Sequence, residues 1–457
     1  MSERAGAIKA GLGVQGPARS AQARYAVGIL LAINLLNFFD RGLPGAFAEP
    51  IRHEFGLSDT ALGWLGTVFV LCYAAVGLPV GRLADRWRRN RLLAMGVGLW
   101  SLLTAATGLA WSSLSLYVSR IGVGLGEAAC APTGQSLIGD LFPREQRARA
   151  LAIFMLGLPL GIWLAFYFGG VVGSAYGWRK AFLIAAVPGL VLSGFALFIH
   201  DPPRGASEAR GGTAGEPPLT TRAAFMRVLS NPVMLWIVAS GALHNFNMYA
   251  INGWQNALLQ RYHGLSLHAA SNVSATSLGA VGVIGMLVGG WLGDRVGTRR
   301  AGGRLLIAAI CMLLAVPCVT LALRQPPGSI GAYTLLMGTG FGFAFVYYAT
   351  VYAAIQDVIA PDLRATAVAV YFFAMYLAGA AMGPVLTGAL SDSLSRRAMV
   401  AAHGTTLEPF KAVGLHQAMY IIPMVMLGAA LVLFAATWTA RRRSVAAGGP
   451  RVASAAP

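Results

Sequence analysis

Charged residues are scarce in this chain. Of its 457 residues only 11% are Asp, Glu, Lys or Arg, whereas 56% are hydrophobic and the mean hydropathy is +0.63. A soluble globular domain has roughly 25% charged residues. This shortage of charge excludes a water-soluble enzyme.

Acidic residues are scarcer still, with 17 Asp and Glu against 35 Lys and Arg, which leaves a formal net charge of +18. The basic excess does not predict a nucleic-acid partner, because it is not gathered on a soluble domain. The basic residues fall in short runs between apolar stretches of about 20 residues, the pattern of a polytopic α-helical membrane protein.

The few cysteines and the missing nucleotide motif exclude further classes. Cys72, Cys130, Cys311 and Cys318 lie inside apolar segments and lack CxxC or metal-ligand spacing. We therefore expect neither a disulfide scaffold nor a zinc site. No Gly-rich P-loop is present, which disfavours ATP-driven transport. We expect no metal and no cofactor.

The apolar stretches predict an all-α protein with twelve transmembrane helices. The first stretch is too long for the core of a signal peptide, so we interpret it as a spanning helix. About 25 residues give roughly 37 Å of helix, enough to cross a ~30 Å hydrocarbon core with some tilt. The predicted helices are 25–48, 60–83, 92–112, 114–141, 148–175, 178–199, 232–259, 268–293, 303–323, 328–358, 365–391 and 412–440.

The basic residues also predict the topology. Loops on the side of the two termini hold 25 of the 35 Lys and Arg residues, and the opposite loops hold 8. Positively charged loops stay in the cytoplasm, so we expect both termini there, in a multi-pass protein of the cell (inner) membrane.

One polar, Pro- and Gly-rich stretch at 201–221 separates two groups of six predicted helices, as a flexible linker does. It predicts five segments: an N-terminal tail (1–24), a six-helix bundle (25–200), a linker (201–231), a second six-helix bundle (232–440) and a C-terminal tail (441–457).

The two halves share sequence features, and duplication of a six-helix unit is typical of transporters that rock between two states. Three motifs occur twice in the same order: GRLADR at 81–86 and GWLGDR at 290–295, GxGxG at 122–126 and 338–342, and an Asp seven residues before an Arg at 140–147 and 357–364.

The segment GRLADRWRRNR at 81–91 resembles the loop 2–3 motif of the major facilitator superfamily, G-x-x-x-D-R-x-G-R-R. It departs at the second glycine, where Arg88 stands, whereas the second copy keeps Gly297. The resemblance extends over essentially the whole chain. It implies the major facilitator fold, two pseudo-symmetric bundles of six transmembrane helices.

Within that superfamily the chain is most similar to Spinster-type transporters. The similar residues are NFFDR at 37–41, GRLADR at 81–86 and RIGVGLGEA at 120–128. This resemblance implies lysophospholipid or sphingoid-phosphate substrates.

Four ionisable residues interrupt the predicted spans: Asp40, Arg41, Arg120 and Glu127. Such groups are costly in a bilayer and usually face a cavity or a partner. A helical rise of about 1.5 Å per residue puts Asp40 and Arg120 level with each other. We therefore expect Asp40 to pair with Arg120 or with its neighbour Arg41.

Glu127 and Asp40 are the predicted proton-coupling residues, because the proton affinity of a carboxyl group in a bilayer changes with solvation and nearby charge. We expect Arg120, Arg41 and Asn37 to bind substrate or to act as counter-ions. The alternative is a permanently ionised network that only holds helices together, and for Arg120 both roles stay open.

A cytoplasmic gate is predicted where the repeated motif meets the membrane boundary. Positive-inside anchoring is the better explanation for the arginines taken singly, but an aspartate interrupts the basic run at the same place in both halves. The resemblance implies that Asp85 and Arg86 belong to a latch between the bundles. The predicted gate comprises Gly81, Asp85, Arg86, Arg89, Arg144, Asp294 and Arg295.

Helices 1, 4, 7 and 10 line the central cavity in the superfamily, and here helices 7 and 10 are rich in amides and aromatic rings. The alternative is that these residues bridge helices or lie at the membrane interface, and that His244 is simply packed. The predicted lining residues are His244, Asn245, Asn252, Trp254, Tyr347, Tyr348 and Tyr352.

These observations predict a proton-coupled secondary transporter of an amphipathic or anionic solute that works by alternating access. A symporter of small organic acids and a drug/proton antiporter stay open as alternatives. A membrane enzyme is disfavoured because no catalytic constellation is found, and the internal repeat argues against a channel. The expected partners are protons, membrane lipids and the solute, without nucleic acid, and the chain is expected to be a monomer.

Overall fold

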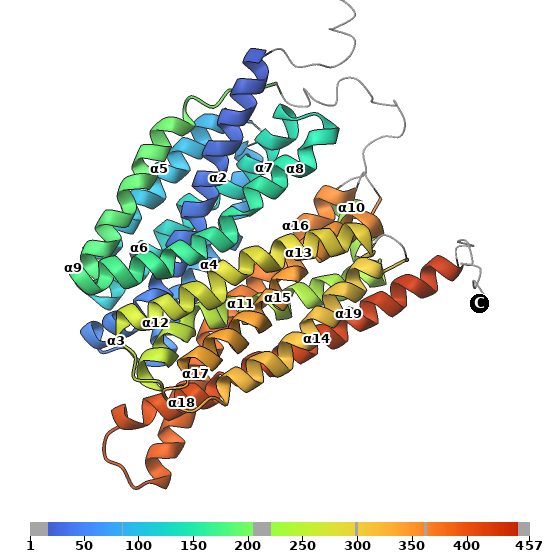
Figure 1. Ribbon diagram of the computed structural model, residues 1–457. Helices are drawn as coiled ribbons and strands as arrows, with labels where there is room; N and C mark the ends of the chain where they lie inside the picture. The colour runs from blue at the N-terminus through green and yellow to red at the C-terminus, as the bar shows by residue number, and fades with distance from the viewer. Residues whose placement is uncertain (1–16, 85, 204–220, 298–299, 361–362, 447–457) are drawn as a thin grey trace, which may run out of the picture.

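A computed structural model describes residues 17–84, 86–203, 221–297, 300–360 and 363–446. These ranges form helices joined by short connections, with no β-strand among them. Figure 1 shows two groups of helices that meet at one end and diverge toward the other. The first group runs from α2 to α9, and the second from α11 to α19.

The segment labelled α9 in the first half contains two helices, as predicted for 148–175 and 178–199. They meet at Gly177, whose φ of 80° and ψ of 162° are not helical and suit a residue without a side chain. The first half comprises α2 (Pro17–Ala46), α3 (Ala48–Phe55), α4 (Asp59–Ala84), α5 (Arg89–Gly108), α6 (Ser113–Glu127), α7 (Cys130–Leu141), α8 (Arg144–Met155) and α9 (Gly157–Ala196).

The second half begins with α10 (Thr221–Leu229), which meets α11 (Pro232–Arg261) at an 85° bend. The Asn231 side chain accepts a hydrogen bond from the Val233 N–H and caps α11, with proline at the first helical position. The other elements are α12 (Leu267–Ser274), η1 (Ala275–Ala280), α13 (Val281–Arg295), α14 (Gly303–Leu323), α15 (Ile330–Val358), α16 (Arg364–Ala374), η4 (Met375–Ala380), α17 (Met382–Ala401), η5 (Glu408–Phe410), α18 (Lys411–Ala418) and α19 (Ile421–Ala446).

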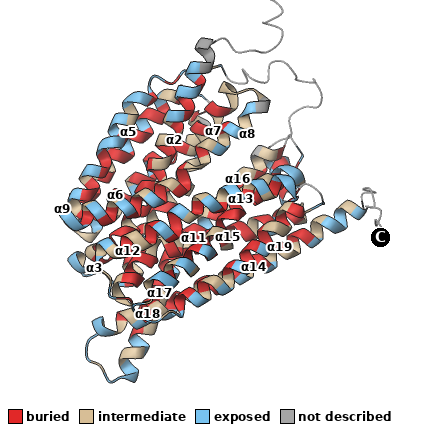
Figure 2. Cartoon of the chain, in the orientation of Figure 1, coloured by how far each residue is buried: buried red, intermediate tan, exposed pale blue. Residues whose placement is uncertain are grey.

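Within the described ranges, nine helices are long and apolar enough to cross a membrane, or ten if α10 and α11 form one span. The predicted number of twelve is larger for two reasons. Residues 149–196 count as one span although they cover two predicted helices, and α6 has only 15 residues before the break at 128–129. Twelve spans stay a prediction. Figure 2 shows exposed residues along the outer faces of the helices, and many are large and apolar, as Phe198 and Leu335 are. Lipid contact favours such a surface.

The two halves are in backbone contact at the end that carries α3 and α18, which we name the closed end (Figure 1). A methyl group on Gly63 would lie 2.6 Å from the Pro384 carbonyl oxygen, and one on Gly388 would clash with that of Asp59. Glycine at these positions lets α4 and α17 touch. The opposite end, where α7 and α8 diverge from α10 and α16, we name the open end.

Candidate functional site

The four intramembrane charges converge in the interior of the first half, next to the second. Asp40 and Arg41 come from α2, and Arg120 and Glu127 come from α6. All four are buried, and Glu127 has no exposed surface. Gly126 lets α6 approach closely here, because a methyl group at this position would lie 2.7 Å from the Trp100 backbone nitrogen.

Glu127 is held by two donors from α2. Its Oε2 accepts hydrogen bonds from Arg41 Nε at 2.8 Å and from Asn37 Nδ2 at 2.9 Å. The contact with Arg41 is an ion pair between two buried side chains. Its other oxygen, Oε1, receives no hydrogen bond from any group in the described ranges. The carboxylate is therefore bound on one side only.

Arg41 also reaches the second half. Its Nη1 donates to the hydroxyl groups of Tyr249 on α11, at 3.1 Å, and Tyr376 on η4, at 3.3 Å. The guanidinium lies 4.4 Å from the ring centre of Tyr73, a cation–π distance. One side chain thus connects Glu127 of the first half with two tyrosines of the second.

The expected ion pair of Asp40 with Arg120 or Arg41 is absent from the part of the chain that the structure describes. Asp40 Oδ2 accepts a hydrogen bond from Thr104 at 3.1 Å, and Arg41 turns to Glu127 instead. Arg120 lies over the Phe69 ring at 5.0 Å, while its Nε and Nη1 have no hydrogen-bond acceptor among the described residues. Arg120 is therefore a buried cation with unused donors.

A small cavity lies between this cluster and the closed end. It has a volume of about 50 Å³, and because one water needs ~10–15 Å³ it holds only a few. Arg41 and Arg120 line it from the first half, and Tyr249, Asn252 and Trp254 line it from the second.

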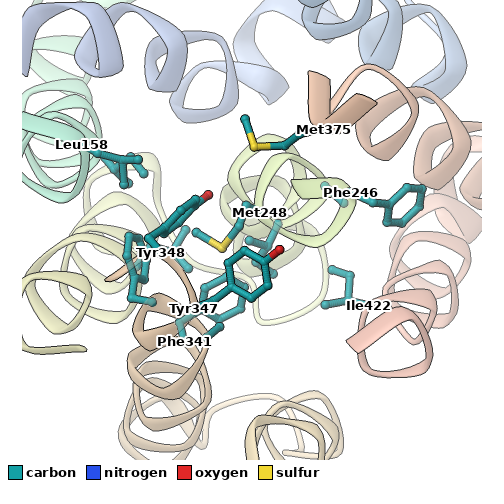
Figure 3. Packing of buried hydrophobic residues seen from close by; sticks show 14 of the residues in the cluster. Leu158, Phe246, Met248, Phe341, Tyr347, Tyr348, Met375 and Ile422 are labelled. Atoms are coloured by element: carbon teal, nitrogen blue, oxygen red, sulfur yellow. The ribbon is translucent and has the colours of Figure 1, made fainter. Parts of the chain in front are cut away.

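The other residues predicted to line a cavity pack together in the second half. His244 stacks on Tyr347 at 4.0 Å between ring centres and meets the edge of Tyr348 at 4.8 Å. The Tyr348 hydroxyl donates to Asn245 Oδ1, and the Tyr352 ring lies 5.8 Å from that of Tyr348. Figure 3 shows Tyr347 and Tyr348 packed among buried hydrophobic residues that include Met248 and Phe341. Five of the seven predicted lining residues thus form an aromatic wall, and Asn252 and Trp254 line the small cavity.

A second charge network, which the sequence analysis missed, joins the halves at the closed end. Arg261 at the end of α11 donates to both oxygens of Asp59 at 2.8 and 2.9 Å, and to Glu49 Oε1 at 2.7 Å. Asp392 of α17 accepts hydrogen bonds from the backbone N–H groups of Asp59 and Thr60, at 3.1 and 2.8 Å. Asp59 and Arg261 stand at helix ends and Asp392 lies within α17, all on the far side from the basic loops, and that position was the available signal.

In the described ranges, every hydrogen bond between the halves lies between Arg41 and the closed end. Besides Arg41 and the closed-end network, Thr67 Oγ1 donates to the Ala381 carbonyl and Asn256 Nδ2 to that of Ala46, both at 2.6 Å. The described hydrogen bonds between the halves are therefore gathered toward the closed end.

The predicted gate residues lie at the open end, and their recorded contacts stay within one half. Arg89 is buried and donates to Asp140 and Asp201 of its own half. Asp294 pairs with Arg304 at 3.4 Å, and Arg295 lies over the Trp291 ring. Gly81 lies in α4, Arg86 is exposed, and Arg144 begins α8. Asp85 and the Arg144 side chain lie outside the described residues.

Comparison with known proteins gives the class of this molecule. Residues 30–384 match the family model of the Major Facilitator Superfamily, so the chain belongs to this superfamily. It is therefore a multi-pass membrane protein and a secondary transporter of a small solute.

Two relatives give the subfamily. An "MFS-type efflux pump" of Mycolicibacterium smegmatis is 32% identical over 81% of this chain and 85% of its own. The human "Protein spinster homolog 3" is 31% identical over 82% of this chain and 77% of its own. Together with the structural likeness below, these matches make the chain a transporter of the Spinster type.

Two solved structures of a Spinster homologue support the same assignment. A bacterial homologue of the human lysosomal transporter Spinster, in an inward-facing and unoccupied conformation, has a TM-score of 0.82 at 27% identity and covers 94% of this chain and 98% of its own. The same kind of protein in an inward-facing and occupied conformation has a TM-score of 0.76 at 26% identity, covering 93% of this chain and 98% of its own.

Proposed function

We propose that this protein is a proton-coupled transporter of an amphipathic or anionic solute that works by a rocker-switch mechanism. The observation that carries the proposal is the buried ion pair between Arg41 and Glu127, because Arg41 also bonds to both Tyr249 and Tyr376 across the junction between the halves. A proton on Glu127 removes the negative charge that holds Arg41. The state of one carboxyl group thus alters the contact between the bundles.

The energy available from this pair is large enough to drive a conformational change. Removing one partner of a buried ion pair costs about 3–5 kcal/mol, because the other charge is left without compensation. A difference of ~5.5 kcal/mol moves a two-state equilibrium from 1:99 to 99:1. Protonation of Glu127 therefore supplies most of this difference, and Asp40 is a second buried carboxyl group in the same cluster.

The substrate proposal rests on the unused donors of Arg120 and on the aromatic wall. An anionic head group that reaches Arg120 satisfies its Nε and Nη1 and competes with Glu127 for Arg41. Guanidinium groups bind carboxylate and phosphate through paired hydrogen bonds. The rings of Tyr352, Tyr348 and Tyr376 suit an apolar body. The names of the spinster relatives support a transporter of this type.

The rocking motion is proposed from the distribution of contacts. The hydrogen bonds recorded between the described residues of the two halves lie toward the closed end, so we propose that in alternation the closed-end network breaks while a latch forms at the open end. Arg86 and Asp294 are exposed and near enough to the opening to take part. With both termini in the cytoplasm, the open end faces inward.

A gradient experiment tests the proposal. Purified protein in liposomes of defined composition is given a pH gradient of either sign, and lysophosphatidylcholine, lysophosphatidylglycerol and small dicarboxylates are offered as substrates. We expect saturable flux of a lysolipid that depends on the gradient. Flux of all substrates that is unchanged when the gradient is collapsed contradicts proton coupling, and flux without saturation contradicts a transporter.

Drug/proton antiport is a second candidate, favoured by the relative named an efflux pump. A cationic drug has no use for the free donors of Arg120, so Arg120→Gln leaves its transport unchanged or improves it. Transport of an anionic solute falls in the same variant. The different effects of Arg120→Gln on transport of a cationic drug and of an anionic solute therefore distinguish the two candidate functions.

A further inference from the structure

The two halves carry the same ion pair at the open end. In the first half Arg89, at the start of α5, donates to Asp140 at the end of α7. In the second half Arg304, in the first turn of α14, donates to both oxygens of Asp357 at the end of α15, each at 2.8 Å. The two aspartates belong to the repeated Asp-to-Arg motif. The clusters are therefore equivalent places in the internal repeat.

The cluster of Arg89 and Asp140 in the first half contains a second carboxylate. Asp201, just after the last helix of this half, accepts hydrogen bonds from Arg89 Nε and from the Arg89 backbone N–H, both at 2.7 Å. This carboxylate caps the first residue of α5. Arg89 is 1% exposed. A negatively charged oxygen group is thus part of the packed structure at this place.

In the second half, the other acid on Arg304 is the exposed Asp294 of α13, at 3.4 Å, and among the described residues no carboxylate after the last helix caps α14. Near the end of its last helix stand Arg443 and Ser444, and a cavity of about 490 Å³ opens between α11, α14, α15 and α19. The cap position of α14 is Gly302, whose φ of 69° is left-handed and which has no side chain to accept a hydrogen bond. The position that Asp201 occupies in the first half corresponds to a cavity in the second half.

The lining of this cavity has an excess of positive charge. Arg300, Arg304 and Arg443 line it together with one acid, Asp357. Asp357 and, outside the lining, Asp294 are both paired with Arg304, so neither of these recorded ion pairs involves Arg300 or Arg443. The Arg443 side chain donates to Asn231 Oδ1 at 2.9 Å, a neutral acceptor. The Arg300 side chain forms no hydrogen bond or ion pair with any residue that the structure describes.

Positive-inside anchoring accounts for arginines at this boundary but not for this arrangement. Anchoring residues need only face lipid head groups or water, whereas Arg300 and Arg443 come from a loop and from α19 and line one cavity. Two cations that line the same cavity repel each other unless an anion lies between them.

We propose that this cavity binds a phosphate group, which takes the place that the Asp201 carboxylate has in the first half. Arg300 and Arg443 bind its oxygens, since guanidinium groups match phosphate in geometry and charge. The group belongs to an anionic phospholipid at the membrane boundary or to a free phosphate ion. A bound phosphate group links the end of α19 to the start of α14. The site is separate from Arg41 and Glu127, so this inference does not depend on the transported solute.

The test is thermal unfolding of the full-length protein with the two sources offered separately. One series adds inorganic phosphate to protein in neutral detergent. The other compares nanodiscs of phosphatidylcholine with nanodiscs that also contain phosphatidylglycerol. At ten times the dissociation constant, we expect a rise in Tm on the order of 2 °C. A rise in both series identifies free phosphate as sufficient, and a rise only with phosphatidylglycerol identifies a lipid head group.

Two pairs of substitutions make the test specific. Arg300→Gln with Arg443→Gln removes the excess charge of the cavity and should abolish the rise. Arg441→Gln with Arg442→Gln removes the same charge from the same helix outside the cavity lining and should keep it. Arg300→Gln alone, at an exposed position, should weaken phosphate binding at least tenfold without affecting folding. An equal rise in all variants, equal losses in both pairs, or no rise in the wild type overturns the proposal.

Discussion

The central cluster and the closed-end network are both groups of buried charges, but their hydrogen bonding differs. At the closed end Asp59 receives bonds from Arg261 and from Ser391, so that both of its oxygens are satisfied. In the central cluster Glu127 Oε1, Asp40 Oδ1 and two nitrogens of Arg120 have no partner in the described ranges.

This difference separates a structural lock from a site that is ready for a ligand. Buried polar groups are normally satisfied, and leaving one unpaired costs about 1–3 kcal/mol. The closed-end network has its bonds and stabilises the present conformation. The central cluster has unpaired donors and acceptors at the junction of the halves, where a proton and an anionic group would supply what is missing.

The largest effect is expected when the residue that connects the two halves is removed. Arg41→Ala leaves Glu127 as an unpaired buried charge and removes the bonds to Tyr249 and Tyr376. We expect substrate flux in proteoliposomes to fall at least 100-fold, consistent with a loss of about 3 kcal/mol or more. Arg396→Ala, at an exposed position, is the matched control and should keep normal flux. Normal flux in Arg41→Ala would show that the cluster is only structural.

The second effect concerns the closed end. Arg261→Gln removes the cation shared by Asp59 and Glu49, so the closed end should open more often. Spin labels at Ser58 and Thr405, one on each half, should show the population of the longer distance at least tenfold larger than in the wild type, for a loss of ~1.4 kcal/mol or more.

Arg179→Gln is the control for this experiment, because the recorded side-chain bonds of Arg179 stay within the first half, with Glu54 and with carbonyl groups at 108 and 110. It should leave the distance distribution unchanged. If Arg261→Gln also leaves it unchanged, the closed-end network is not the lock.

A smaller effect is expected at Arg120, because no ion pair is lost there. Arg120→Gln should weaken binding of an anionic solute about tenfold, corresponding to one charge-assisted hydrogen bond of ~1.5 kcal/mol. Binding of a neutral analogue with the same apolar body should not change. Thermal stabilisation by the two ligands measures this, and equal weakening of both would assign Arg120 a structural role.

The smallest effect lies outside the membrane-spanning segments, at Glu54 of α3. Partial burial acts to raise the pKa of Glu54, but hydrogen bonds from Arg179 and Trp178 and the charge of Arg179 outweigh it, so this pKa is lowered. The resulting stabilisation is present above the unfolded pKa of ~4.3 and is lost as the pH falls through the folded value. Glu54→Gln should therefore lower the free energy of unfolding near neutral pH by less than about 1 kcal/mol, because the pair is exposed, with a correspondingly small fall in Tm. The difference from wild type should disappear below about pH 4, and a difference that grows there would have the wrong sign.

The sequence predicted the helices and the membership of the central cluster, but not its pairing. Spacing along a helix gives depth and face, which put Asp40 level with Arg120. It gives no lateral distance between α2 and α6, and that distance decides that Arg41 meets Glu127. The segments NFFDR and RIGVGLGEA, which carry the family resemblance, contain all four charges, and the functional role of these residues stays a prediction.

The closed-end network could not be predicted because its members are far apart in the chain. Asp59, Arg261 and Asp392 each occur as a single charge near a helix end, where hydration alone explains them. Only the packing of α4 against α17 and α11 brings them together. The cavity beside Arg443 could not be predicted from the sequence either, because it depends on which side chain occupies the equivalent position in each half.

The central claim, that Glu127 carries the coupled proton, is tested most directly by comparing two kinds of flux in Glu127→Gln. Glutamine keeps the shape and a hydrogen bond to α2 but cannot gain or lose the proton. Gradient-driven accumulation in proteoliposomes should be lost, whereas exchange of labelled for unlabelled substrate without a gradient should continue. Accumulation that still follows the pH gradient in Glu127→Gln would contradict the account.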